Sequence, residues 1–284
     1  MKFSESHILV ILRWSTVCLF LGRACLHIFW NVPYDTLWLE EDWMKGIAHG
    51  LGYSWHQWET DESVRMFFNG FQWTIGGVYV LLAGLTSFLK ASHPKKLGKL
   101  LWLGSGLLFF LAFVSFKSHN YLWPQWWEHT IQFTIPIFFY LALYRPPIRS
   151  YLLLLKVAIA MTFTCHGLFA FGWPFETPAN FLEMVRNILP LNDEMARIFL
   201  TIAGGLDFVV SLLIFFPKWS RAALIYAVIW GSLTALARVV AHVDLDQTLL
   251  DLLRWLPETI LRIPHATIPL VVWMLIKSPE KGEL

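Results

Sequence analysis

The stretch "CHGLFAFGWPFET", Cys165–Thr177, ends a long apolar run with a histidine, a passage of small and aromatic residues, and Pro-Phe-Glu-Thr. Earlier in the chain, "CLHIFWNVPYDT", Cys25–Thr36, contains the same features in the same order. Both stretches leave an apolar segment through Cys, His, aromatic residues and then Pro, an aromatic residue, an acid and Thr. This recurrence predicts that the chain contains two copies of one structural unit.

The composition predicts a membrane protein. Of the 284 residues, 56% are hydrophobic and 15% are charged, with 16 Trp and 23 Phe, and the mean hydropathy is +0.53. Soluble domains carry about 25% charged residues, so the expected solvent for much of this surface is the lipid bilayer. The net charge is only +2 and the basic residues are scattered, which argues against nucleic acid as a partner.

Continuous apolar segments predict membrane-spanning helices. Crossing the hydrocarbon core takes about 20 mostly apolar residues in a helix, and only helices and closed barrels satisfy their backbone groups in lipid. Seven segments meet the length test, and an eighth is shorter in its purely apolar part and carries two prolines. The predicted fold class is therefore all-α, a polytopic transmembrane bundle of eight helices at 8–30, 71–90, 99–118, 127–144, 149–171, 196–216, 220–242 and 258–276.

The distribution of charge predicts the orientation. The connections 90–99, 145–149 and 217–221 are basic, whereas 31–71, 172–194 and 243–264 carry an excess of acids. Because cytoplasmic loops are enriched in Lys and Arg, both termini are predicted to be cytoplasmic and the acidic loops to be extracytoplasmic, with 31–71 the longest. We expect a multi-pass protein of the inner membrane.

Further matches extend the repeat over the whole chain. Thr-Ile-Gly-Gly at 74–77 corresponds to Thr-Ile-Ala-Gly-Gly at 201–205, Gly-Ser at 104–105 to Gly-Ser at 231–232, and Thr-Ile-Pro at 134–136 to Thr-Ile-Pro at 267–269. The matches keep their order, so we expect two four-helix repeats, 1–147 and 148–284. Since each repeat has an even number of helices, the repeats are predicted to be parallel, related by an axis along the membrane normal.

The second repeat resembles the DoxX-like family of four-helix bacterial membrane proteins. The resemblance rests on Cys165-His166-Gly167-Leu168 at a helix end, the Pro-acid loop, the Gly-rich helix 202–216 and the basic turn 217–221. The chain departs from the family in carrying the unit twice, in its long 31–71 loop, and in having Phe169-Ala170-Phe171 where a basic residue is usual. The resemblance implies a link to membrane redox chemistry, because DoxX-like proteins include subunits of thiosulfate:quinone oxidoreductases and partners of oxidative-stress enzymes.

Six of the ten histidines lie near the predicted outer helix ends, three in each repeat. We expect them to form one layer at the extracytoplasmic side. Imidazole binds metals and haem iron and hydrogen-bonds polar head groups, so these side chains are candidates to bind a metal, a haem or a quinone head group, and the cofactor stays open. The other interpretation is that these side chains bond only lipid headgroups, water and helix-end backbone. The six are His27, His119, His129, His166, His242 and His265.

Charged residues inside the apolar segments are the second group of candidates. Arg23 and His27, and likewise Arg238 and His242, are four residues apart and share a helix face. Asp207 lies well inside its helix, where a lone carboxylate is costly, so a partner such as Arg238 or Arg23 is expected. Such a pair either fixes helix packing or forms a substrate or proton site.

Glu128 and His129 follow two tryptophans at the start of the segment 127–144. They have the composition of an acid–base pair. The same residues also satisfy a helix start, where an acid in the first turn is stabilised by the helix dipole and Trp anchors at the interface.

Together these candidates predict a polar pocket at the extracytoplasmic side, lined by Arg23, His27, His119, Glu128, His129, His166, Asp207, Arg238, His242 and His265. The first hypothesis is a redox-associated, quinone-linked subunit; whether it is itself an enzyme stays open. The alternatives are a non-enzymatic accessory or scaffold subunit that docks a membrane or periplasmic protein partner, and a small-solute transporter.

Overall fold

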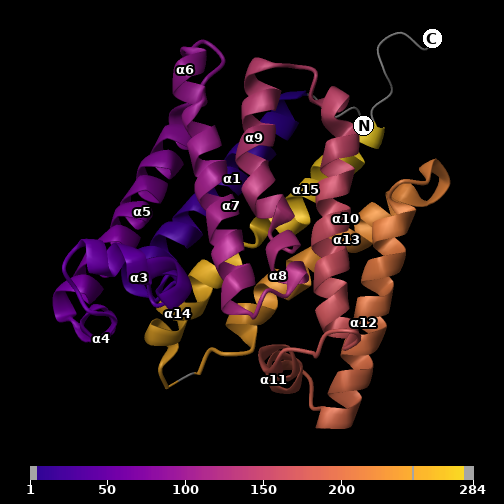
Figure 1. The fold of residues 1–284 in the computed structure, drawn as a ribbon. Helices are drawn as coiled ribbons and strands as arrows, with labels where there is room; N and C mark the ends of the chain where they lie inside the picture. The colour runs from indigo at the N-terminus through magenta and orange to yellow at the C-terminus, as the bar shows by residue number, and fades with distance from the viewer. Residues whose placement is uncertain (1–4, 245, 278–284) are drawn as a thin grey trace.

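The structure, a computed structural model, describes residues 5–244 and 246–277, and in these ranges every regular element is a helix (Figure 1). The long helices are α1 (Glu5–Phe29), α5 (Glu62–Phe88), α7 (Leu100–Ser118), α9 (Thr130–Tyr144), α10 (Leu152–Phe171), α12 (Asp193–Leu213), α13 (Pro217–Val240) and α15 (Ile263–Lys277). The shorter ones are α2 (Asp35–Trp38), α3 (Glu41–Gly50), α4 (Trp55–Thr60), α6 (Lys95–Gly98), α8 (Trp123–Trp127), η1 (Ile148–Tyr151), α11 (Ala179–Ile188) and α14 (Thr248–Ile260). The two chain ends, which the charge pattern places in the cytoplasm, lie outside the described residues.

Seven helical segments in the described ranges are long and apolar enough to cross a membrane. They are Glu5–Phe29, Glu62–Phe88, Lys95–Ser118, Ile148–Phe171, Asp193–Leu213, Pro217–Val240 and Thr248–Lys277. The fold is a helical bundle with the character of a multi-pass membrane protein. The predicted segment 127–144 is the exception, because its helix, α9, has only 15 residues.

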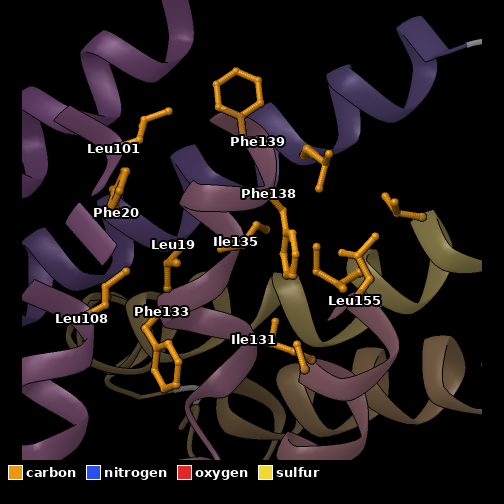
Figure 2. Close-up of a cluster of buried hydrophobic side chains, with 14 of the residues drawn as sticks. Leu19, Phe20, Leu101, Leu108, Ile131, Phe133, Ile135, Phe138, Phe139 and Leu155 are labelled. Atoms are coloured by element: carbon orange, nitrogen blue, oxygen red, sulfur yellow. The ribbon is translucent and has the colours of Figure 1, made fainter. Parts of the chain in front are cut away.

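Helix α9 is short because it lies inside the protein rather than against lipid. Twelve of its 15 residues are buried, so its length is not set by contact with the hydrocarbon core. Figure 2 shows its side chains at the centre of the hydrophobic core, among residues of α1, α7 and α10. The α9 side chains labelled there are Ile131, Phe133, Ile135, Phe138 and Phe139.

The outer helices expose apolar side chains, as a surface solvated by lipid requires. On α12 an apolar stripe at helical spacing is between 43% and 61% exposed: Ile198, Ile202, Leu206, Val209 and Leu212. Helix α13 exposes a second stripe of the same kind, which includes Ile225, Ile229, Leu233 and Leu236. In water such a continuous apolar surface is a site of association, whereas in a bilayer it is the ordinary exterior.

Helices of the two halves make matching sets of contacts. Helix α1 packs along α5, as α10 packs along α12; α7 packs on α9, as α13 packs on α15. Across the halves, α1 contacts α14 and α15, while α10 contacts α8 and α9. Helices α9 and α15 also touch each other and lie between the two halves.

The polar connections are more structured than the hydropathy pattern indicates. The segment 31–71 contains α2, α3, α4 and the start of α5, and 243–264 contains α14. Short helices α3, α4, α11 and α14 lie at one end of the bundle, and α6 lies at the opposite end (Figure 1). A small apolar cluster holds the first of these segments together, because the Trp58 indole donates to the Trp38 carbonyl at 2.8 Å. Lys117 of α7 ion-pairs with Glu40 and ties the cluster to the bundle.

Helices α10 and α12 approach each other at backbone distance. A Cβ atom placed on Gly204 would lie 2.5 Å from the Phe171 nitrogen and 2.6 Å from the Gly167 carbonyl oxygen. Small residues permit such close packing in membranes, where van der Waals contact drives helix association. Helix α10 then ends at Gly172, whose φ of +80° suits glycine.

Candidate functional site

Most of the predicted site residues lie near the ends or starts of long helices, whereas Asp207 lies in the interior of α12. Arg23, near the end of α1, donates a hydrogen bond to Gln132 in the first turn of α9. One turn earlier, Glu128 faces His166, near the end of α10, with 3.4 Å between Oε2 and Nδ1. Helices α1 and α10 therefore end at the same end of the bundle, beside the start of α9.

Glu128 lies at the centre of a cluster of imidazoles. Its Oε1 is 3.8 Å from the Nδ1 of His129, in addition to the contact with His166. The ring of His166 lies 5.6 Å from that of His265, at the start of α15. The structure thus brings His129 and His166 to one carboxyl group and places His265 beside His166, each from a different helix boundary.

Two further charged residues complete this end of the bundle. Arg262 ion-pairs with Glu258, four residues before it, and also donates to the Glu258 carbonyl oxygen at 2.8 Å. Glu258 was not among the predicted residues. The signal that identifies it is the spacing of four from Arg262, which favours an ion pair. Glu258 lies in the last turn of α14, and Arg262 lies in the turn between α14 and α15.

Burial raises the pKa of Glu128 from its usual 4.5 to about 7, while the guanidinium groups of Arg262, Arg238 and Arg23 oppose that rise. Glu128 lies between α8 and α9, outside the seven candidate spans. A carboxyl group with this pKa changes charge near neutral pH. It is therefore suited to hold or release a proton beside His166.

This pKa predicts a pH dependence of stability. Between pH 4.5 and 7 the unfolded chain loses the Glu128 proton while the folded protein keeps it, so stability falls as the pH rises through this window. We expect Glu128→Gln to remove this component, which amounts to up to about 3 kcal/mol. Melting temperatures in detergent at pH 5 and pH 8 measure it.

The exposed Glu183 on α11 provides the control. Glu183→Gln should keep the wild-type difference in melting temperature between the two pH values. An unchanged difference in the Glu128→Gln protein would contradict the raised pKa.

A cavity of about 480 Å³ opens beside this cluster, between α10, α12, α13 and α15 and next to α11. Its wall is mostly apolar and includes Phe163, Phe181, Val185, Phe199, Trp230 and Leu233. The polar side chains in the wall are His166, Asp207, Arg238, Arg262 and His265. An apolar cavity with a few convergent polar groups is the usual form of a small-molecule site.

Asp207 does not form the predicted ion pair with Arg238 or Arg23. Its side chain is buried, and Oδ1 has no hydrogen-bond partner among the described residues. The missing side chain of Gly167 lets α12 pack close, since a Cβ there would lie 3.1 Å from the Cβ of Asp207. The Cβ atom of Asp207 is therefore held against α10, and the side chain lines the same cavity as His166. The Arg238 guanidinium instead lies over the ring of Phe181, at 6.0 Å.

The other three predicted histidines lie in separate surroundings. His27 is fully buried and its Nε2 lies 2.9 Å from the Tyr34 hydroxyl. His242 stacks on Trp255 with 3.7 Å between ring centroids. His119 is exposed and its Nδ1 lies 2.8 Å from the carbonyl oxygen of Ser115 in its own helix. A common depth in the membrane, as predicted, does not by itself bring these histidines together, because they lie on different helices.

Whether the protein can hold a metal ion depends on how its His, Cys, Asp and Glu side chains are arranged. Within residues 5–244 and 246–277, no group of three or more His, Cys, Asp or Glu side chains is arranged to hold a metal ion. Comparison with protein-family models, with curated proteins and with solved structures finds no match for the chain.

Proposed function

We propose that this protein is a DoxX-like, redox-associated subunit of the inner membrane that binds a quinone in the cavity between α10, α12 and α13. The observation that carries the proposal is the cavity itself: an apolar space of about 480 Å³, inside a lipid-solvated bundle, with imidazole and guanidinium groups in its wall. A ligand that reaches such a site from the bilayer is apolar over most of its length and polar at its head. Quinones have this form.

The guanidinium groups match the carbonyl oxygens of a quinone. A carbonyl oxygen only accepts hydrogen bonds, and a guanidinium only donates them. The Nε of Arg238 is buried and has no partner in the described ranges. A bound carbonyl oxygen would satisfy the Arg238 side chain, which a purely apolar ligand would leave unpaired.

The proposed architecture has eight spans in two parallel repeats with both termini in the cytoplasm. The matching contacts of the two halves support it, since every pairing made by α1, α5, α7 and α9 has a counterpart made by α10, α12, α13 and α15. Counting back from the two Thr-Ile-Pro motifs also aligns Pro124 with Pro257 and Gln132 with His265. Helix α9 takes the place of α15 in this scheme and is the eighth span.

Equilibrium binding of decylubiquinone to the purified protein in detergent tests the proposal. We expect saturable binding with one site per chain, weakened about tenfold in Arg238→Gln because one charge-assisted hydrogen bond is lost. The control is Arg221→Gln, an exposed residue near the start of α13 that does not line the cavity. Absence of saturable binding in the wild-type protein would contradict the proposed function.

A further inference from the structure

The first half of the chain contains a buried group of rings around His27. Its Nδ1 lies 2.7 Å from the carbonyl oxygen of Arg23, which can only accept, so the ring proton is assigned to Nδ1. The lone pair on Nε2 then accepts a hydrogen bond from the phenol of Tyr34 at 2.9 Å. Tyr79, Phe71 and Phe110 surround these two rings: Tyr79 packs edge-on against His27, and Phe71 and Phe110 pack against Tyr34.

The corresponding positions in the second half form the cavity. The repeat motifs align His27 with His166, Tyr79 with Asp207, and Phe110 with Ala237. All three second-half residues line the cavity. Two aromatic rings of the first half are thus replaced by the smaller side chains of Asp207 and Ala237.

The phenol of Tyr34 also has no equivalent in the second half. Tyr34 aligns with Phe175, which has no hydroxyl group and packs against Phe169 and Trp123 instead of lining the cavity. The cavity therefore corresponds to the volume that the first half fills with its own tyrosines.

His166 offers the cavity an acceptor. Its Nδ1 faces the Glu128 carboxyl group at 3.4 Å, and an ionised carboxylate only accepts, so the proton of the neutral ring resides on Nδ1. The lone pair then lies on Nε2, for which the described residues provide no partner. His265 repeats this arrangement: its Nδ1 lies 3.1 Å from the Arg262 carbonyl oxygen, and its Nε2 is unpartnered. An acceptor nitrogen pairs with a hydroxyl group and not with a carbonyl oxygen.

We propose that the cavity selects the reduced, hydroxyl-bearing form of its ligand, a quinol, whose hydroxyl donates to His166 Nε2 as the Tyr34 phenol donates to His27. The inference rests on the proposed function and specifies the form of the ligand. The hydroxyl oxygen keeps two lone pairs, so it also accepts from the Arg238 guanidinium. A quinone bound at the same place would set its carbonyl oxygen against the lone pair of His166.

Competition binding of decylubiquinol and decylubiquinone, under argon at pH 8, tests the inference. Glu128 is ionised at this pH, above its pKa of about 7. We expect the quinol to bind about tenfold more tightly, the effect of one additional hydrogen bond in a buried site. Equal binding, or tighter binding of the quinone, overturns the inference and leaves the proposed function intact. If neither compound binds, the proposed function itself fails.

Two variants test whether His166 is the residue that accepts the quinol hydroxyl. His166→Phe removes the Nε2 lone pair, and we expect it to abolish the tenfold preference, because the quinol loses its acceptor and the quinone loses the repulsion between its carbonyl oxygen and that lone pair. The matched control is His242→Phe, since His242 stacks on Trp255 outside the cavity. A His166→Phe protein that still prefers the quinol tenfold would refute the assignment to His166. The comparison of the two ligands on the wild-type protein stands even if that variant fails to fold.

Discussion

Replacing Gly204 with leucine is expected to destabilise the fold more than any other single change considered. The new Cβ would lie 2.5 Å from the Phe171 nitrogen and 2.6 Å from the Gly167 carbonyl oxygen, both backbone atoms that no side-chain movement can relieve. Helices α10 and α12 would have to separate along their contact. We expect a loss of at least about 3 kcal/mol, typical of overpacking combined with a displaced helix. Thermal unfolding in detergent, followed by circular dichroism, measures the loss.

The neighbouring glycine is the matched control. A Cβ on Gly205 would meet no atom within 4 Å, because this residue faces away from α10. Gly205→Leu makes the same chemical change one position along the helix and should stay within about 0.5 kcal/mol of the wild type, as for a surface position. Equal melting temperatures for the two variants would contradict the close approach of α10 and α12.

Introducing two aromatic residues of the first half at the aligned positions of the second half is expected to abolish ligand binding. The double variant Asp207→Tyr with Ala237→Phe introduces at two cavity positions the residues found at 79 and 110. Both rings would occupy the space of the ligand, so we expect the affinity for decylubiquinone and decylubiquinol to fall at least about a hundredfold. The fold should tolerate the change, since Tyr79 is fully buried in the first half and Asp207 gives up no ion pair.

Leu236→Phe is the control for this variant. Leu236 neighbours Ala237 on α13 but is 52% exposed and does not line the cavity. It should leave both affinities unchanged. Undiminished binding in the double variant, with a wild-type melting temperature, would show that the ligand binds elsewhere and that the cavity is not the site.

In the proposed repeat architecture, the two halves are copies of one unit that differ in the side chains beside the helix-ending histidine. In the first half, Tyr79 and Phe110 pack in the space beside the helix-ending histidine. In the second half, Asp207 and Ala237 stand at the aligned positions, and a cavity lies there beside His166. In the proposed repeat architecture, one half is a structural support and the other carries a candidate binding site. The double variant tests whether aromatic rings at positions 207 and 237 fill the cavity.

The sequence alone determined the class of fold and the positions of most of its helices. Apolar length is a local property, because each span must satisfy its own backbone in lipid, and seven predicted segments correspond to candidate spans. The predicted segment 127–144 does contain a helix, α9, but this helix is shorter than the seven candidate spans and is mostly buried by its neighbours. The hydropathy criterion also left most of α14, Thr248–Ile260, as a connection.

Which polar groups meet was decided only by the tertiary structure. The position of six histidines near predicted helix ends placed them at one expected depth in the membrane. Whether they touch also depends on which helices are neighbours and which faces those helices present. The close packing permitted by Gly167 and Gly204 holds Asp207 against α10 and away from an ion pair with Arg238. The cavity likewise arises from side chains that are small at positions brought together from separate helices, and a volume shared by several helices is not a property of any one segment.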